Sequence, residues 1–397
     1  MPFALLQSPP LRPKLQCQWR SVQSESVTRA QSEERILNEY KYRLGELFCG
    51  PGGMALGAHL AAAEVPGAQV QHAWASDYDQ STVDTYIHNT PGADVNSVPV
   101  EDVRVLDISE LADIDGFAFG FPCNDFSVVG EHRGLHGTYG PLFQYGVNVL
   151  QQKKPKWFVA ENVGGLTGAN GGQAFQYILR SMRSAGYETV VHKYRFEKYG
   201  VPQARHRIIV VGIRRDLHDD GISFEVPDPS LAEYVPETSR QAITIPKIPD
   251  DAFNHEFTHQ SDIVRQRLEL IGPGQNAFTA DLPEELRLNV KGARLSQIYK
   301  RLDPTKPAYT VTGSGGGGTH VYHWSEPRAL TNRERARLQT FPDWYEFKGN
   351  KESVRKQIGM AVPPRGAKVI FKALFQSLQR IPYPSIEPNL MNSEVKA

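Results

Sequence analysis

The stretch RLGELFCGPGGMALGAHLAAAEV, from Arg43 to Val65, is decisive for the fold. Its apolar start predicts a strand over 43–48, its small-residue end predicts a helix over 52–65, and glycines form the turn between them. A strand-to-helix turn of this kind presents free backbone N–H groups at a helix N-terminus, as in loops that bind adenosine-containing cofactors. Alone, the loop also fits a purely structural turn or the relaxed fingerprint of a nicotinamide enzyme.

The same alternation continues along the chain. Further strands are predicted at 70–77, 116–122, 155–163, 188–195 and 207–215, and further helices at 80–90 and 172–187. We therefore expect an α/β fold with a doubly wound, mostly parallel sheet, whose ligands bind at the carboxyl ends of its strands.

The domain organisation follows from changes along the chain in proline content and in the alternation of strand and helix signals. Residues 1–40 read as an extension, proline-rich at first and ending in a short helix at 32–41. Residues 41–215 form the predicted catalytic and cofactor-binding domain, and 216–325, which lack regular alternation, form a second, smaller domain. Residues 326–397 are expected to complete the first domain, with a helix over 356–378 that packs back onto the sheet.

Composition bounds the class of protein. The 397 residues are 40% hydrophobic and 22% charged, with a formal net charge of zero. No apolar run reaches the roughly 20 residues of a membrane span, and no signal peptide is recognisable, so we expect a soluble, cytoplasmic protein without membrane association. Three cysteines without a paired spacing argue against disulfides and a zinc site, so no metal is expected.

Residues at predicted strand ends suggest a cofactor site. The glycine loop contributes Phe48, Gly50, Gly52 and Gly53. Asp77 ends the next strand, where a carboxylate can bind ribose hydroxyls. Tyr78 can stack on adenine, and Asp102 can accept a hydrogen bond from the adenine amine. These residues alone do not separate a methyl donor from a hydride carrier.

Four further motifs narrow the choice: PCNDFS at 122–127, ENV at 161–163, QARHR at 203–207 and RALTNRERARLQTFPD at 328–343. With FCGPGG at 48–53 and GMAVPP at 359–364, their order and spacing resemble the DNA (cytosine-5) methyltransferases, over roughly residues 42–380. The resemblance implies a Rossmann-like methyltransferase fold, S-adenosylmethionine as methyl donor, and a DNA-recognition role for 216–325. It also implies cofactor contacts by Phe121 and Ala361.

The chemistry explains the grouping. Carbon 5 of cytosine is a weak nucleophile, and a thiolate that adds at carbon 6 makes the ring an enamine. Cys123 is the candidate nucleophile, although a buried structural cysteine is the alternative. Glu161 can handle the proton at ring nitrogen 3, while Asn162 is expected to order the turn. By resemblance, Arg207 contacts the cytosine carbonyl oxygen and Arg205 contacts phosphates or the active-site network.

These groups cannot reach a stacked base, so the target cytosine must be flipped out of the duplex. The glycine-punctuated stretch 128–140 is expected to close over it. Asn124, Ser127, Arg133 and Gln203 are the predicted DNA contacts, and alternation along one strand would place Gln203, Arg205 and Arg207 on one face. The arginines of 328–343 are interpreted as scaffold first and DNA contacts second.

Two positions depart from the family pattern. Met360 stands where an asparagine is usual, which affects the expected contacts near the cofactor, and Thr138 and Tyr139 precede Gly140 where an arginine is common. One phosphate or loop-closing contact is then either absent or supplied by His132 or Arg133.

The leading hypothesis is a bacterial or phage modification enzyme that acts on double-stranded DNA, monomeric and paired with a restriction endonuclease. Two alternatives stay open: an RNA cytosine-5 methyltransferase of the same architecture, and a non-catalytic DNA-binding homologue.

Overall fold

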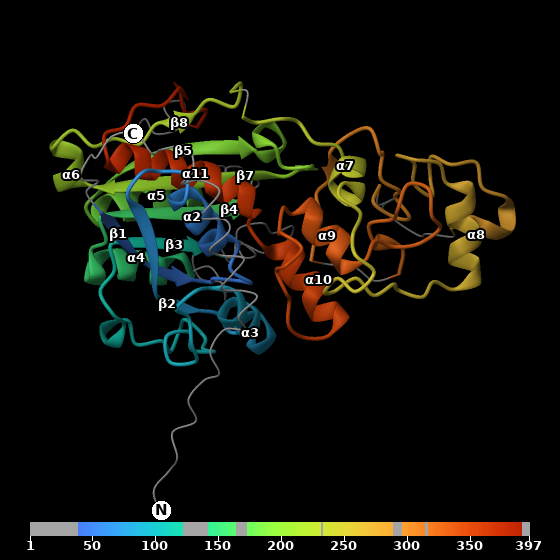
Figure 1. Cartoon of the computed structure of the whole chain (residues 1–397), viewed down its shortest axis with the longest axis horizontal. Helices are drawn as coiled ribbons and strands as arrows, with labels where there is room; N and C mark the ends of the chain where they lie inside the picture. Colours follow the sequence, from blue (N-terminus) through green and yellow to red (C-terminus); the bar gives the residue numbers. More distant parts are fainter. Residues whose placement is uncertain are drawn as a thin grey trace, which may run out of the picture.

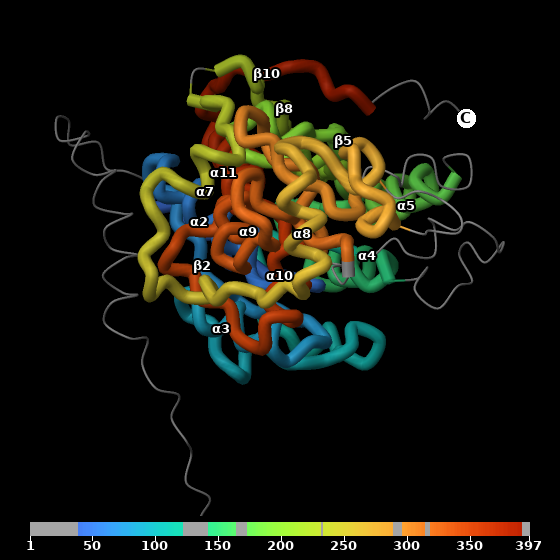
Figure 2. The backbone as a smooth tube through the Cα atoms, turned by 90° about the vertical axis from the view of Figure 1, so that its right-hand side faces the viewer, coloured from blue at the N-terminus to red at the C-terminus, as the bar shows by residue number. Residues whose placement is uncertain are grey.

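A computed structural model describes residues 39–121, 142–163, 173–231, 233–288, 296–313 and 317–390. The predicted site residues Cys123, Asn124, Ser127 and Arg133, and the departure at 138–139, lie outside these ranges. The described chain forms a larger lobe built on a sheet and a smaller lobe beside it (Figure 1). Viewed from the side, the smaller lobe lies in front of the sheet (Figure 2).

A six-stranded sheet of order β2-β1-β3-β4-β7-β5 forms the centre of the larger lobe. Its strands are β1 (Tyr40–Leu47), β2 (Ala68–Ser76), β3 (Gly116–Gly120), β4 (Trp157–Val163), β5 (Tyr187–Arg195) and β7 (His206–Arg214). Strands β2, β1, β3 and β4 pair in parallel, whereas β7 runs antiparallel to both of its neighbours. The mostly parallel, doubly wound sheet is thus confirmed, and the carboxyl ends of β1 to β4 meet at one edge.

Helices cover both faces of this sheet (Figure 1). They are α2 (Gly53–Ala62), α3 (Gln80–Asn89), α4 (Leu142–Lys153), α5 (Gln173–Ser184) and α11 (Pro364–Leu378). Side chains of β4 alternate between two cores, as the period of two requires. Trp157 and Val159 enter the core shared with α2 and α11, and Phe158 and Ala160 enter the core shared with α4 and α5.

The smaller lobe has its own buried clusters. It contains α7 (Ser239–Thr244), α8 (Asp262–Leu270) and the short strand β9 (Ala308–Tyr309), and it packs against α9 (Asn332–Leu338) and α10 (Lys351–Met360). Strand β9 pairs with β6 (Gln203–Ala204), and β8 (Val226–Pro227) pairs with β10 (Ser385–Ile386). Val226 is buried in the core of the larger lobe, so the first residues of the predicted 216–325 domain pack there.

Several predicted boundaries differ from the observed ones. The expected helix over 356–378 is two helices, α10 and α11, because Pro363 and Pro364 interrupt the backbone hydrogen bonding between them. Strand β1 begins at Tyr40, inside the helix expected at 32–41. Helix α4 was not anticipated. None of the helices in the described ranges is long and apolar enough to cross a membrane.

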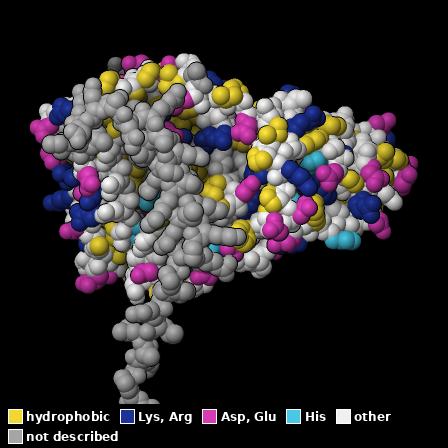
Figure 3. Space-filling view, in the orientation of Figure 1, with side chains coloured by type: hydrophobic (Ala, Val, Ile, Leu, Met, Phe, Trp, Pro, Cys, Tyr) yellow, Lys and Arg dark blue, Asp and Glu magenta, His cyan; other side chains and the backbone are white. Residues whose placement is uncertain are grey.

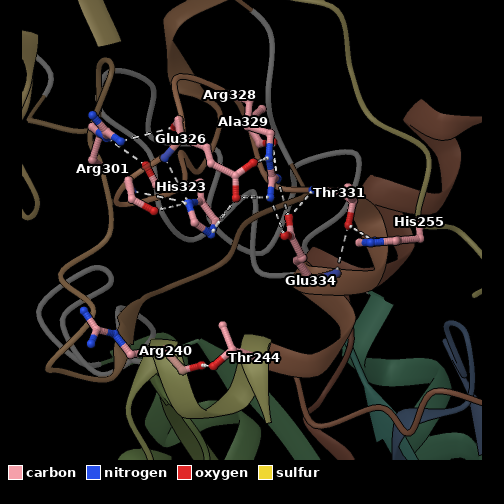
Figure 4. A network of polar contacts seen from close by, with 11 residues as sticks. Arg240, Thr244, His255, Arg301, His323, Glu326, Arg328, Ala329, Thr331 and Glu334 are labelled. Carbon is pink, nitrogen blue, oxygen red and sulfur yellow. Dashed lines mark hydrogen bonds and ion pairs between the residues drawn. The ribbon is translucent and has the colours of Figure 1, made fainter. Parts of the chain in front are cut away.

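The arginine-rich segment 328–343 holds the smaller lobe together (Figure 4). Arg328 forms ion pairs with Glu326 and Glu334 at 2.7 and 2.8 Å. Glu334 also closes a capping box with Thr331 at the start of α9, and Thr331 Oγ1 lies 2.9 Å from His255 Nδ1. These contacts confirm the scaffold interpretation of this segment.

Candidate active site

The glycine loop and the end of β2 are tied together by one carboxylate. The Gly50 backbone N–H donates to Asp77 Oδ2 at 3.1 Å, and the Asp79 N–H donates to Asp77 Oδ1 at 3.2 Å. Burial raises the pKa of Asp77, and the backbone donors oppose that rise. Tyr78, next in the chain, is 62% exposed. A fixed carboxylate and an exposed aromatic ring thus follow one another at the end of β2.

The loop itself takes conformations that require glycine. Gly50 and Gly52 have φ of 56° and 88°, and Gly52 is the N-cap of α2. A Cβ on Gly53 would lie 2.2 Å from the carbonyl oxygen of Val362, so the turn after α10 packs directly on the start of α2. The first and last sequence motifs are therefore in contact.

The other predicted cofactor residues surround this edge. Phe48 packs half-buried against the core beneath α4 and α5, and Phe121, just after β3, is 4% exposed. Ala361 is buried as the C-cap residue of α10. Asp102 is already engaged by Arg104, whose hydrogen bonds lower the pKa of that carboxyl group.

These residues fit an adenosine-containing cofactor. Among the residues that the structure describes, no atom lies within 4 Å of the position that a Cβ on Gly50 would take, so these residues leave that side of the loop open. Asp77 presents its carboxylate beside this opening, and the exposed ring of Tyr78 adjoins it. Backbone amides, a carboxylate and an aromatic ring are the groups that such a cofactor requires.

A second cluster lies at the carboxyl ends of β3 and β4. Arg207 Nε forms an ion pair with Glu161 Oε1 at 2.7 Å, and each side chain is 13% exposed. In the register of the sheet Glu161 pairs with Gly120, where an added Cβ would lie 3.4 Å from Glu161 Oε2. Glu161 and Arg207 therefore meet at the strand end that leads to Cys123, three residues after Gly120 in the sequence.

Arg205 and Gln203 do not join that cluster. The chain leaves β6 at Ala204 and enters β7 at His206, and these strands belong to different sheets, so the three side chains do not share one strand face. Arg205 is 1% exposed and donates to the carbonyl oxygens of Val311 and Gly359 at 3.2 and 3.1 Å. Burial lowers the pKa of Arg205 to about 9, with a smaller contribution from Arg207.

Gln203 is fully buried, and its amide is already used. It donates to Leu338 O and Gln339 Oε1 at 3.2 and 3.1 Å and accepts from Val311 N at 2.8 Å. This geometry corrects the predicted DNA contact of Gln203, because no part of its side chain reaches the surface.

Asn162 fixes the end of β3. Its Nδ2 donates to the carbonyl oxygen of Phe121 at 2.9 Å, and its Oδ1 accepts from the Val163 N–H at 2.7 Å. The side chain orders the backbone at the strand end, as the sequence suggested.

Comparison with known proteins identifies the family. The family model described as C-5 cytosine-specific DNA methylase matches residues 42–376. The chain belongs to this family.

Two relatives show how specific the match is. The chain is 56% identical to the Type II methyltransferase M.BbvI of Brevibacillus brevis over 357 residues, which cover 87% of this chain and 94% of the relative. It is 40% identical to the Type II methyltransferase M.NgoFVII of Neisseria gonorrhoeae, over 84% and 86% of the two chains.

Solved structures show the same fold. A proposed DNA modification methyltransferase encoded within a prophage of E. coli superposes with a TM-score of 0.64 at 22% identity, over 85% of this chain and 99% of that one. The Dnmt2 methyltransferase of S. pombe gives a TM-score of 0.56 at 15% identity, over 85% and 99%.

Two residues near the cofactor edge of this DNA methylase were missed from sequence. Lys356 Nζ lies 3.2 Å from Tyr78 Oη and 5.5 Å from the centre of the Tyr78 ring. Lys356 precedes Met360 by one helical turn on α10, and this spacing is the sequence feature that could have placed Lys356 on the same helix face as Met360. Met360 itself is 62% exposed. Tyr345 donates a hydrogen bond to the Pro51 carbonyl oxygen, which no local pattern indicates.

Two further observations concern the surface charge of the smaller lobe and the possible metal ligands among the described residues. Lysine and arginine side chains intermingle with aspartate and glutamate on the face of the smaller lobe in Figure 3. No group of three or more His, Cys, Asp or Glu side chains within the described ranges is placed to hold a metal ion.

Cys49 lies buried in the glycine loop, and burial raises the pKa of its thiol well above the usual range.

Proposed function

We propose that this DNA (cytosine-5-)-methyltransferase modifies one cytosine within a short, specific sequence of duplex DNA, as the modification enzyme of a Type II restriction-modification system. The ion pair of Glu161 and Arg207, on the same sheet edge as the glycine loop, carries the proposal. Both similar relatives named above are called Type II methyltransferases. A monomer, a cytoplasmic site of action and a cognate endonuclease belong to the same proposal.

The glycine loop, Asp77 and Tyr78 are proposed to hold S-adenosylmethionine. When bound, this cofactor supplies the methyl group. The backbone amides at the start of α2 bind its polar groups, and Asp77 accepts from the ribose hydroxyls. Tyr78 covers the adenine, while Phe48, Phe121 and Ala361 line the remaining wall.

Cys123 is the proposed nucleophile. Its thiolate forms a bond to carbon 6 of the flipped cytosine, and the electron pair of the 5,6 double bond moves to carbon 5, in conjugation with nitrogen 3 and the carbonyl oxygen. After methylation at carbon 5, a base or a water molecule removes the carbon-5 proton. The electrons of the carbon-5–hydrogen bond form the 5,6 double bond, and the carbon–sulfur bond breaks with its electron pair going to sulfur, which regenerates the Cys123 thiolate. Nitrogen 3 returns its proton to Glu161.

Glu161 and Arg207 are proposed to accommodate the charge that this addition creates. Glu161 takes up a proton from solvent and passes it to nitrogen 3, and the Arg207 guanidinium donates to the carbonyl oxygen of cytosine. Arg207 uses Nε for Glu161 and Nη1 for the carbonyl oxygen of His206 at 2.8 Å. A guanidinium has five N–H donors, so Arg207 keeps further N–H groups that can donate to the cytosine.

Arg205 is proposed to act by positioning. Its two hydrogen bonds join β6 and β7 to Val311 in the smaller lobe and to Gly359 at the end of α10. They fix the backbone from which Arg207 extends. Contact of Arg205 with DNA phosphates is not part of the proposal, because the guanidinium is buried.

The decisive experiment is tritium transfer from labelled S-adenosylmethionine to mixed genomic DNA, with wild type and Cys123→Ala side by side. Base-resolution mapping of 5-methylcytosine follows. We expect label at cytosine in one short recurring sequence, no label with the variant, and undiminished cofactor binding by the variant. Labelled structured RNA without labelled DNA would establish the RNA alternative instead. Cofactor binding with transfer to neither would indicate a non-catalytic protein.

A further inference from the structure

Tyr345 contacts the glycine loop from the interior of the protein. The residue lies between α9 and α10, is 1% exposed, and donates its hydroxyl proton to the carbonyl oxygen of Pro51. Pro51 stands between the two positive-φ glycines of the loop. A residue almost 300 positions away in the sequence therefore fixes the peptide at the centre of the proposed cofactor loop.

Two tyrosines form a floor beneath this loop. A Cβ on Gly52 would lie 2.8 Å from Tyr345 Oη and 3.3 Å from Tyr86 Cδ2. Tyr86 is itself held by a hydrogen bond of 2.6 Å to Glu46 Oε1. At Gly50, no atom of the described part of the chain lies within 4 Å of the position that a Cβ would take. Within that part, the loop is supported at Gly52 and open at Gly50.

The Tyr345 backbone is also held firmly. Arg333 Nη2 donates to the Tyr345 carbonyl oxygen at 2.6 Å, and Arg333 Nη1 donates to that of Pro342 at 3.0 Å. The next residue, Glu346, donates its N–H to Asn89 Oδ1 at 3.2 Å, on the helix that follows Asp77 and Tyr78. One segment therefore contacts both halves of the cofactor edge.

We propose that Tyr345 is a positioning residue for the cofactor, a role that rests on the proposed binding of S-adenosylmethionine at this loop. Its hydroxyl fixes the Pro51–Gly52 peptide, and Gly52 is the N-cap of α2, so the hydroxyl orients the N–H groups at the start of α2 that bind the cofactor. Without this donor the buried carbonyl is unpaired, and Gly52, on the far side of the Pro51–Gly52 peptide, allows that peptide to rotate. Apparent affinity falls in proportion to the population of the competent loop conformation.

A matched pair of variants tests this role. Tyr187, at the start of β5, is fully buried and donates to the Pro155 carbonyl oxygen at 2.7 Å, so it makes the same kind of hydrogen bond in another part of the sheet. We expect Tyr345→Phe to raise the Kd for S-adenosylmethionine about tenfold and Tyr187→Phe to change it less than about twofold. Isothermal titration calorimetry on the full chain without DNA measures both, and thermal unfolding should show similar losses of Tm.

Kinetics separate positioning from general stability. Tyr345→Phe should raise the KM for the cofactor by the same factor, with kcat at saturating cofactor and the KM for DNA within about twofold of wild type. Equal Kd values for Tyr345→Phe and wild type would overturn the inference alone, as would equal increases in both variants. Failure of wild type to bind S-adenosylmethionine would overturn the proposed cofactor and this inference with it.

A double-mutant cycle supplies a second readout. Gly52→Ala places a methyl group against the Tyr345 hydroxyl, so its effect on the Kd should be smaller in the Tyr345→Phe background. Additive effects of the two substitutions would contradict direct support of the loop by this hydroxyl.

Discussion

Two arginine-rich segments, 203–207 and 328–337, look similar in sequence and serve different ends in the structure. In the first, Arg207 meets the carboxylate of Glu161 at a strand end, and both side chains keep some exposure. In the second, Arg333 is fully buried and meets backbone carbonyl oxygens. Arginine density alone therefore does not indicate phosphate binding.

The two arginines within the first segment, 203–207, also differ from one another. Arg205, two residues before Arg207, also binds only carbonyl oxygens among the described groups. Within 203–207, the guanidinium at the strand end that leads to Cys123 has the proposed chemical role, and the one bound to carbonyl oxygens has a structural role. A carboxylate partner alone does not mark a chemical role, because Arg328 also pairs with Glu326 and Glu334. Substitutions in the two classes should consequently change different quantities.

The largest effect is expected for Glu161→Gln. An amide cannot deliver a proton to ring nitrogen 3, so kcat should fall about 10²- to 10⁴-fold while cofactor affinity stays unchanged. Single-turnover tritium transfer to cognate DNA measures it. Glu197→Gln is the matched control, because Glu197 is 15% exposed and pairs with Arg195 and His206 on the neighbouring strands. A kcat for Glu161→Gln within about threefold of wild type would break the comparison.

The second effect concerns stability. Arg333 binds the carbonyl oxygens of Phe253, Pro342 and Tyr345 at 2.9, 3.0 and 2.6 Å, and a lysine ammonium cannot span all three. Arg333→Lys should lower the free energy of unfolding by about 3 kcal/mol, because buried acceptors are left unpaired. Urea unfolding measures the loss, with the exposed Arg180→Lys on α5 as control. Unchanged stability would show that these carbonyls find other donors.

Arg205 and Arg207 allow a structural and a catalytic arginine to be compared two residues apart. Arg205→Lys should cost about 2 kcal/mol of unfolding free energy, since one of two buried carbonyls loses its donor. Arg207→Lys should leave stability nearly unchanged and lower kcat about 10²-fold. Urea unfolding and single-turnover kinetics on both variants give four values. The reverse pattern would exchange the roles assigned to the two residues.

The smallest effect, counted per pH unit, is expected at a buried carboxyl group that has no arginine partner. Glu46 is fully buried, Tyr86 is its hydrogen-bond donor, and burial raises its pKa from 4.5 to about 8. Below pH 4.5 both folded and unfolded states carry the proton, and between 4.5 and about 8 only the folded state keeps it. The free energy of unfolding therefore falls as pH rises through this window, by up to about 1.4 kcal/mol per pH unit.

Glu46→Gln should remove that contribution. The slope of unfolding free energy against pH should become less negative in the same window, measured by urea unfolding at several pH values. The exposed Glu110→Gln serves as control and should leave the slope unchanged. Identical slopes for wild type and Glu46→Gln would mean that Glu46 is ionised in the folded protein.

Much of the larger lobe follows from sequence because strand, turn and helix signals are local. The glycine loop and the strand-end acids Asp77 and Glu161 are of this kind. The antiparallel direction of β7 does not follow from local signals. Strands β5 and β7 are joined without a crossover helix, whereas the alternation of strands and helices earlier in the chain predicts parallel neighbours. Tyr345 and the burial of Gln203 depend on contacts between segments more than 130 residues apart, which no local pattern encodes.

The backbone anchoring of the smaller lobe has a consequence for divergence. Arg333 and Arg337 hold this lobe through the carbonyl oxygens of Ile243, Pro246, Phe253 and their neighbours. Every residue carries a carbonyl group, so these attachments do not depend on which side chains stand at the anchored positions. Mutations can alter the side chains of the lobe while the anchor persists. A single arginine-bearing helix can thus hold lobes with many different surfaces over evolutionary time.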